Sequence, residues 1–126
     1  MEVRMTANKH ILVVDDLKVN FLLIKAMLLR NGMLVSWAEN GYEAIEIVKK
    51  ETNLSAILMD YNMPGIDGLE TTLIIKKLRP DLKVISHSTF TDTSSFDRSK
   101  APFDDYLSKP IDCNQLISLL QKHLKQ

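Results

Sequence analysis

The stretch that decides the fold class is His10-Ile11-Leu12-Val13-Val14, an uninterrupted apolar run that ends abruptly at Asp15-Asp16. A strand that is apolar at every position, rather than at alternate positions, is typically buried on both faces in the middle of a parallel sheet. A similar run, Ala56-Ile57-Leu58-Met59, ends at Asp60. We therefore expect a parallel sheet whose strands carry acidic residues at their carboxyl ends.

Amphipathic stretches separate the apolar runs and predict helices. A helix over residues 19–30 is predicted by helical spacing of the apolar residues Val19, Leu22, Leu23, Ala26, Met27 and Leu29. The other expected strands are 33–38, 84–85 and 106–107, and the other expected helices are 41–50, 68–78 and 114–124. Strands that alternate with helices predict an α/β fold, an open five-stranded parallel sheet with right-handed crossovers and helices on both faces.

Length and composition limit the possible functions. The 126 residues, 45% hydrophobic and 25% charged, are typical of one globular domain. Sixteen basic residues balance sixteen acidic ones, so the chain lacks the basic excess expected of a nucleic-acid binder. The single Cys113 excludes an internal disulfide and fits a reducing compartment. Because the longest apolar run, residues 21–29, contains Lys25, we expect no membrane contact and a cytoplasmic location.

Ionisable and hydroxyl side chains follow four of the expected strands. They are Asp15 and Asp16 after the first strand, Asp60 after the third, Ser88 after the fourth and Lys109 after the fifth. A lone aspartate at a strand end is usually a turn or cap residue, but open parallel sheets bind ligands at this edge, and four strands share the pattern. Clustered carboxylates repel one another unless they are protonated or bridged by a cation, and hard oxygen ligands suit Mg²⁺. A carboxylate nucleophile, a metal and a lysine together indicate phosphoryl transfer.

The motifs at these strand ends resemble a known family. The segments VVDD at residues 13–16, ILMDYNMPGIDG at 57–68, Ser88 and DYLSKP at 105–110 closely resemble the receiver domain of two-component response regulators. The resemblance covers residues 9–126 in family order and leaves residues 1–8 as a leader or linker remnant. It implies a flavodoxin-like sheet with strand order 2-1-3-4-5.

The resemblance also implies the chemistry of the site. Asp60 would accept a phosphoryl group from a phosphohistidine on a sensor histidine kinase or a histidine phosphotransfer protein. Asp16, with Asp15 partly through water, would hold Mg²⁺ together with Asp60 and the backbone carbonyl of Asn62. Lys109 would pair with a phosphoryl oxygen.

The same resemblance implies how the signal leaves the site. Ser88 would move to hydrogen-bond the phosphoryl group, Tyr106 would change rotamer, and the Lys109–Pro110 peptide would be cis. The face built from the fourth strand, the fourth helix and the fifth strand would shift and be recognised by a downstream effector protein. Such a domain is a signalling switch rather than a separate enzyme. It is either free-standing or part of a hybrid sensor histidine kinase, whose receivers the region around Asn20 resembles.

Some residues depart from the family pattern and keep two alternatives open. Thr89 stands where receivers usually carry a small alanine, and residues 101–103 depart from the usual approach to the fifth strand, so the fourth helix is expected to be short or partly disordered. These departures leave room for a pseudo-receiver, an interaction module that carries no phosphate. A haloacid-dehalogenase-like phosphatase also uses a strand-end aspartate, but it needs a second aspartate where this chain has Asn62. His87 is expected to be a packed histidine rather than a ligand, on the opposite side of its strand from Ser88.

Overall fold

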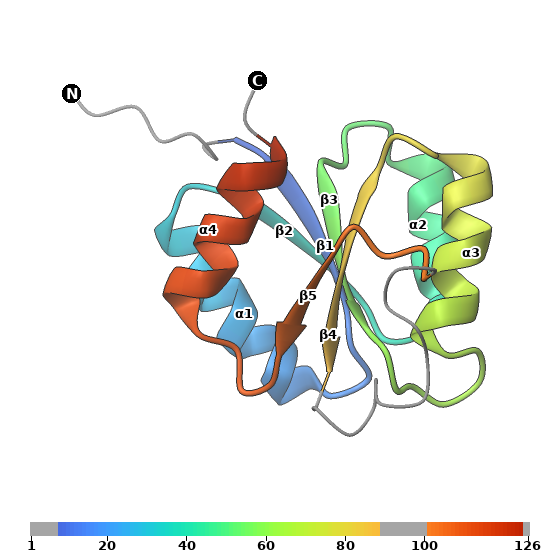
Figure 1. The fold of residues 1–126 in the computed structure, drawn as a ribbon, viewed down its shortest axis with the longest axis horizontal. Coiled ribbons are helices and arrows are strands. Elements are labelled where there is room, and N and C mark those ends of the chain that lie inside the picture. Colours follow the sequence, from blue (N-terminus) through green and yellow to red (C-terminus); the bar gives the residue numbers. More distant parts are fainter. Residues whose placement is uncertain (1–7, 89–100, 125–126) are drawn as a thin grey trace.

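The computed structural model describes residues 8–88 and 101–124. Its five strands are β1 (His10–Val14), β2 (Leu34–Ala38), β3 (Ala56–Asp60), β4 (Lys83–Ser88) and β5 (Asp105–Ser108). They pair in parallel in the order β2-β1-β3-β4-β5, which confirms the expected flavodoxin-like sheet (Figure 1). The strand order reverses between β1 and β3, the position at which open α/β sheets bind their ligands.

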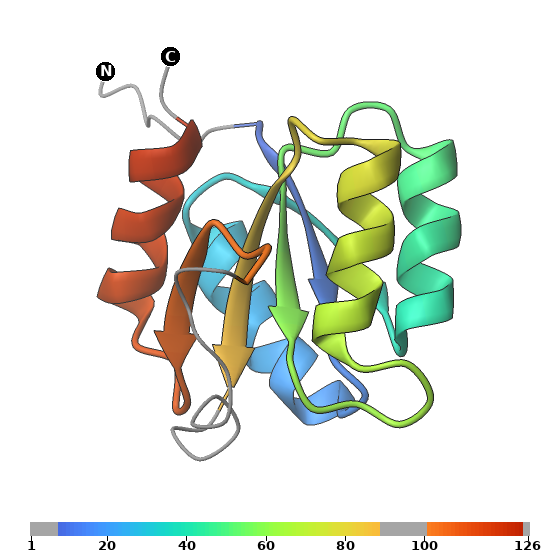
Figure 2. The same ribbon diagram turned by 45° about the vertical axis from the view of Figure 1, so that its right-hand side comes forward.

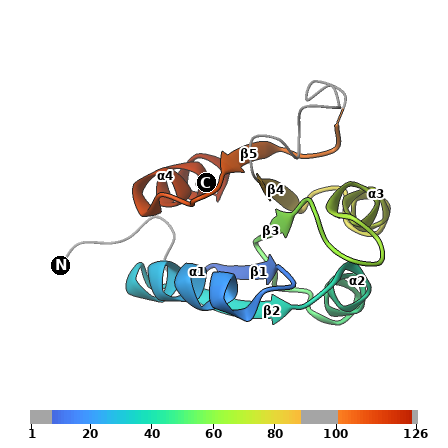
Figure 3. The same cartoon turned by 90° about the horizontal axis from the view of Figure 1, so that it is seen from below.

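Four helices cover the sheet in the part of the chain that is described: α1 (Lys18–Arg30), α2 (Gly41–Lys50), α3 (Gly68–Leu78) and α4 (Cys113–Leu124). Helices α1 and α4 lie on one face and α2 and α3 on the other (Figure 3). Figure 2 shows α2 and α3 side by side against the sheet, in line with their mutual contacts. The expected helices and strands within the described residues are therefore confirmed, with ends that differ by at most three residues.

Each face of the sheet has its own apolar core because successive residues of a strand point to opposite faces. On the α1 and α4 side, the paired residues Val13, Leu58 and Ile85 are fully buried. On the α2 and α3 side, the corresponding core residues are Leu12, Ile57 and Val84. The continuous apolar runs are thus explained by burial on both faces, as expected.

The buried face of α1 differs from the set of residues that predicted the helix. Its buried residues are Phe21, Ile24 and Leu28. Among the residues that predicted the helix, those that are instead largely exposed are Val19 (62%), Leu22 (48%), Leu23 (59%) and Leu29 (50%). Because α1 is apolar on nearly every side, periodicity identifies the helix but not the face that packs on the sheet. The exposed apolar side chains leave α1 with an uncovered surface.

Two expectations fall outside the described residues: the role of Thr89 and the length of the helix between the fourth and fifth strands. The approach to β5 is described from Ala101 onward, where Phe103 is buried. None of the helices in the described ranges has the length and apolarity needed to cross a bilayer.

Candidate functional site

Three carboxylates converge at the point where the strand order reverses. Asp15 and Asp16 follow β1, Asp60 ends β3, and the register that pairs Val14 with Met59 brings the two strand ends together. One carboxylate oxygen from each aspartate lies within 4.8 Å of the others. Asp15 and Asp60 are buried and Asp16 is exposed, so the group is open to solvent on one side only. The acidic cluster expected from the sequence is therefore formed.

In the described part of the chain, Lys109 is the cation that forms ion pairs with this cluster. Its Nζ lies 3.3 Å from Oδ1 of Asp60 and 3.8 Å from Oδ2 of Asp15. The N–H of Lys109 donates to the carbonyl of Ser88, so the pairing of β4 with β5 continues as far as this residue. The Lys109–Pro110 peptide is cis, as expected. One lysine thus faces two buried carboxylates and an exposed one.

The surroundings of Asp60 change the pKa of its carboxyl group. Burial raises the pKa of Asp60 to about 6, because removing a carboxylate from water disfavours its charged form. Lys109 opposes this shift and Asp15 adds to it. The N–H of Asn62 donates to Oδ1 of Asp60 at 3.3 Å and also favours the charged form. Above about pH 6, Asp60 is therefore a poorly solvated carboxylate, which is a favourable state for a nucleophile.

The carboxylate of Asp15 is held by donors that sequence reasoning did not identify. Its Oδ1 accepts the N–H of Leu17 at 2.9 Å. The amide of Asn20 donates to Oδ1 and Oδ2 at 3.4 Å and 3.3 Å. The indole N–H of Trp37 donates to the backbone carbonyl of Asp15 at 2.9 Å, and its ring stacks on Phe21 with centroids 5.1 Å apart. The sequence relates Asn20 to the receivers of hybrid kinases but does not show these bonds, although its position on the first turn of α1 is the signal that would place it near the acidic pair.

The loop after Asp60 is fixed by its glycines and by the cap of α3. The N–H of Gly68 donates to the carbonyl of Tyr61 at 2.8 Å. A side chain at position 68 would collide with the backbone carbonyl of Asp60, so only glycine allows this approach. Asp67 caps α3 by accepting the N–H of Glu70 at 2.8 Å. The start of α3 is thereby attached directly to the strand that carries Asp60.

Ser88 ends β4 and Tyr106 lies in the neighbouring strand β5. Ser88 is 4% exposed, and Asp60 pairs with its neighbour His87 rather than with Ser88 itself. Tyr106 packs edge-on against Phe103, with centroids 5.8 Å apart, and Phe103 in turn lies 6.4 Å from the ring of Tyr61. An aromatic row therefore joins the residue after Asp60 to Tyr106. Phe103, which the sequence showed only as a departure from the family, is the link.

His87 is packed, as expected, and it does not join the ligand set. It is fully buried, and neither ring nitrogen has a hydrogen-bond partner among the residues that the structure describes. Burial, and then the charge of Lys109, lower the pKa of His87 to about 3, while the backbone of Val14 opposes the shift weakly. His87 is therefore a neutral imidazole directly beside the strand end that carries Asp60.

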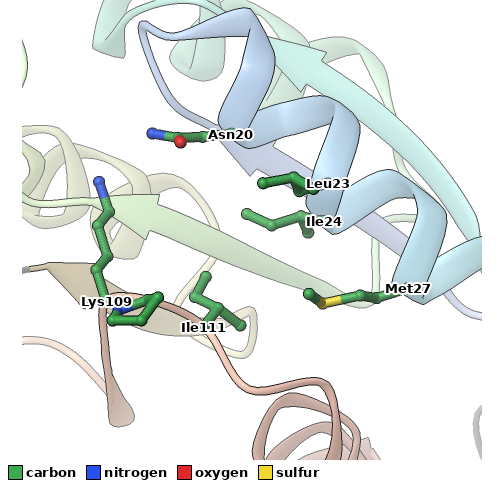
Figure 4. Close-up of a pocket in the computed structure, with 7 residues that line it drawn as sticks. Asn20, Leu23, Ile24, Met27, Lys109 and Ile111 are labelled. Carbon is green, nitrogen blue, oxygen red and sulfur yellow. The ribbon is translucent and has the colours of Figure 1, made fainter.

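A groove lies beside the cluster, between α1 and the segment after β5. Its volume is about 430 Å³, and it is lined by Asn20, Leu23, Ile24, Met27, Lys109, Pro110 and Ile111. Figure 4 shows the amide of Asn20 and the ammonium of Lys109 at one end, with the apolar side chains along the rest. The polar end of the groove is therefore made of two residues that also contact Asp15.

Comparison with known proteins relates the whole site to one family. A family model described as the response regulator receiver domain matches residues 11–121. The chain is 32% identical to the chemotaxis protein CheY of Bacillus subtilis, over 91% of this chain and 97% of that protein. It is 36% identical to hybrid signal transduction histidine kinase B of Dictyostelium discoideum, over 92% of this chain but only 7% of that protein.

A solved structure carries the same fold. The response regulator TrrA of Thermotoga maritima, in complex with Mg²⁺ and BeF, superposes with a TM-score of 0.83 at 34% identity, covering 92% of this chain and 99% of that one. A receiver is a signalling domain, not a classical enzyme. Its acidic cluster, which is compatible with a divalent metal, and its similarity to hybrid kinases and response regulators agree with a phosphorelay switch. The chain belongs to the receiver domains of two-component response regulators.

Proposed function

We propose that Asp60 is the phosphoacceptor of this receiver, with Mg²⁺ as its cofactor and residues 9–126 as the domain. The observation that carries the proposal is the position of Asp60, which is nearly buried, 3.3 Å from the ammonium of Lys109 and within reach of two further carboxylates. Burial raises the pKa of Asp60 even though Lys109 and the N–H of Asn62 contact it, so the carboxylate is costly to retain, and a role in chemistry accounts for it.

The donor set of the site fits Mg²⁺. Three carboxylates with one lysine leave an excess of negative charge, and Mg²⁺ prefers oxygen ligands while it keeps several waters. Asp16 is exposed and Asp60 is close to it, so both suit direct contact, together with the backbone carbonyl of Asn62. Asp15 already accepts bonds from Leu17 and Asn20, which suits a contact through water. When bound, the ion would neutralise the oxygens of the transferred group.

The transfer step follows from these positions. A carboxylate oxygen of Asp60 attacks the phosphorus of a phosphohistidine, the O–P bond forms and the N–P bond breaks. The electron pair of the broken bond returns to the imidazole, which leaves neutral because its other nitrogen carries the proton. The product is an acyl phosphate on Asp60. Lys109 remains beside the new phosphoryl oxygens and stabilises their charge.

We assign the groove beside the site to the protein that delivers the phosphoryl group. An amphipathic helix is held in an apolar groove by side chains on one of its faces, and the walls formed by Leu23, Ile24 and Met27 suit such a helix. The polar end of the groove would place a phosphohistidine of that helix near Lys109. The hybrid histidine kinases among the relatives support a kinase or a histidine phosphotransfer protein as the donor, and hence a cytoplasmic location.

The output route we propose runs through Ser88 and Tyr106. A phosphoryl group brings about −1.5 to −2 charge, which would draw the hydroxyl of Ser88 toward Asp60. The contacts from Tyr61 to Phe103 and from Phe103 to Tyr106 offer a packed path by which that change would alter the face near β5. A downstream effector that prefers one packing of this face would then bind according to phosphorylation.

Phosphorylation by a small donor tests the proposal against its two alternatives. The chain is incubated with acetyl phosphate and Mg²⁺, and intact mass is measured for the wild type and for Asp60→Asn. We expect a gain of one phosphoryl group in the wild type and none in the variant. No gain at any Mg²⁺ concentration would indicate a pseudo-receiver, and rapid multiple turnover of sugar phosphates would indicate a phosphatase.

A further inference from the structure

Asn20 stands between the groove and the acidic cluster. Its amide donates to both carboxylate oxygens of Asp15, at 3.4 Å and 3.3 Å, and its side chain also lines the groove. A donor that contacts both oxygens of one carboxylate opposes rotation of the group about its Cβ–Cγ bond. Asn20 therefore fixes the orientation of the Asp15 carboxylate relative to the neighbouring side chains.

The need for such control follows from the surroundings of Asp15. The side chain is fully buried, so bulk solvent does not reach the lone pairs that protein donors leave open, and only a neighbouring donor or a metal-bound water can satisfy them. Oδ1 accepts a second hydrogen bond, from the N–H of Leu17. Among the described residues, Oδ2 contacts only Asn20 and the more distant Lys109. Without Asn20, the best remaining donor for Oδ2 is the ammonium of Lys109.

That ammonium is already engaged with Asp60. Lys109 lies 3.3 Å from Asp60 and 3.8 Å from Asp15, so a small movement would exchange the closer partner. A lysine drawn to Asp15 would occupy an oxygen that faces the metal and would leave Asp60 less well neutralised. Because the amide of Asn20 already donates to Oδ2 of Asp15, that oxygen does not need Lys109 as a donor, and the ammonium stays with Asp60.

We propose that Asn20 is a positioning residue for phosphorylation: its amide fixes the carboxylate of Asp15 for the metal and keeps Lys109 on Asp60. This inference rests on the proposed function, because it concerns the same metal and the same acceptor. It assigns a role to a side chain that touches neither the acceptor nor the proposed phosphoryl group.

The direct test is the affinity of the domain for Mg²⁺ without any phosphodonor. Trp37 is the only tryptophan and donates to the backbone of Asp15, so its fluorescence reports on this loop, with calorimetry as a second readout. Loss of a residue that orients a metal ligand typically weakens binding about 10- to 100-fold. We expect a loss of about tenfold for Asn20→Leu and Asn20→Ala, because the bonds from Asn20 are long.

Controls separate this role from a general structural one. Leu22→Ala removes an exposed side chain of the same helix that does not line the groove, and its Mg²⁺ affinity should equal that of the wild type. The urea midpoint of both Asn20 variants should stay close to that of the wild type, and their phosphorylation by acetyl phosphate should recover at saturating Mg²⁺. Wild-type affinity in both Asn20 variants would overturn the inference, as would a rate that stays low at saturating Mg²⁺. Failure of the wild type itself to gain phosphate would instead refute the proposed function.

Discussion

The ammonium of Lys109 lies 3.3 Å from a carboxylate oxygen of Asp60. Burial raises the pKa of Asp60, and the positive charge of Lys109 is the largest effect that lowers it. The same ammonium reaches Asp15 at 3.8 Å, so its removal leaves the acidic cluster without its nearby cation.

Lys109→Ala should fold normally, because the side chain is 24% exposed and belongs to neither apolar core of the sheet. Phosphorylation by acetyl phosphate should slow about 100-fold, as is typical when one charge-stabilising donor is lost. In the remaining phosphorylated fraction, the change at Tyr106 that we expect NMR to detect in the phosphorylated wild type should be lost. A fully normal phosphorylation-dependent change in this variant would refute the role that we assign to Lys109.

Asp60→Asn should stabilise the protein at neutral pH in Mg²⁺-free buffer. The pKa of Asp60 is about 6 when folded and 3.8 as a model value, so the folded state binds the proton more tightly. The stability that this group contributes is complete below about pH 4 and is lost as pH rises through about 6. Urea denaturation should therefore show a gain of about 1–3 kcal/mol for the variant near pH 7, which disappears below about pH 4. A variant less stable than the wild type near pH 7 would contradict this reading of Asp60.

His87→Leu should stabilise the protein, and more so in mild acid. Both ring nitrogens are buried without hydrogen bonds to described residues, which costs about 1–3 kcal/mol for an unpaired group. Because the folded pKa is about 3, against 6.5 for the model group, the stability of neutral His87 is present above about pH 6.5 and is lost as pH falls. Asp60 titrates in the opposite sense over part of this range, so the comparison is made in the Asp60→Asn background. If the free energy of unfolding fell equally with pH in Asp60→Asn and in Asp60→Asn with His87→Leu, the imidazole would have to have a hydrogen-bond partner.

Leu23→Glu should slow transfer from a phosphohistidine donor at least about tenfold, because it places a charge on an apolar wall of the groove. Phosphorylation by acetyl phosphate should be unchanged, since Leu23 makes no contact with the acidic cluster. Leu29→Glu is the matched control: Leu29 is 50% exposed on the same helix, close to the 59% of Leu23, but it does not line the groove. Equal effects of the two substitutions would exclude the groove as the docking surface.

The sheet and the acidic cluster could be predicted from the sequence because both follow from local rules. Continuous apolar runs such as Ile57-Leu58-Met59 occur where both faces of a strand are covered, and the parallel arrangement brings Asp15, Asp60 and Lys109 to one edge. No knowledge of packing is needed for either step.

The contacts that support the cluster could not be predicted, because they depend on how helices pack. Periodicity identified α1 but not its buried face, since apolar residues surround the helix. The bonds from Asn20 and Trp37 to Asp15, and the position of Phe103 between two tyrosines, arise only when α1, β2 and the approach to β5 are assembled. Likewise, the sequence predicts that His87 is packed but not that its nitrogens lack partners.

The central claim is that Asp60 carries the phosphoryl group as an acyl phosphate. After incubation with a phosphohistidine donor and Mg²⁺, treatment with sodium borohydride reduces an acyl phosphate to an alcohol, and peptide mass spectrometry locates the product. We expect homoserine at position 60, absent when the metal is chelated. Homoserine at Asp15 or Asp16, or none in a chain that has gained phosphate, would contradict the assignment of Asp60.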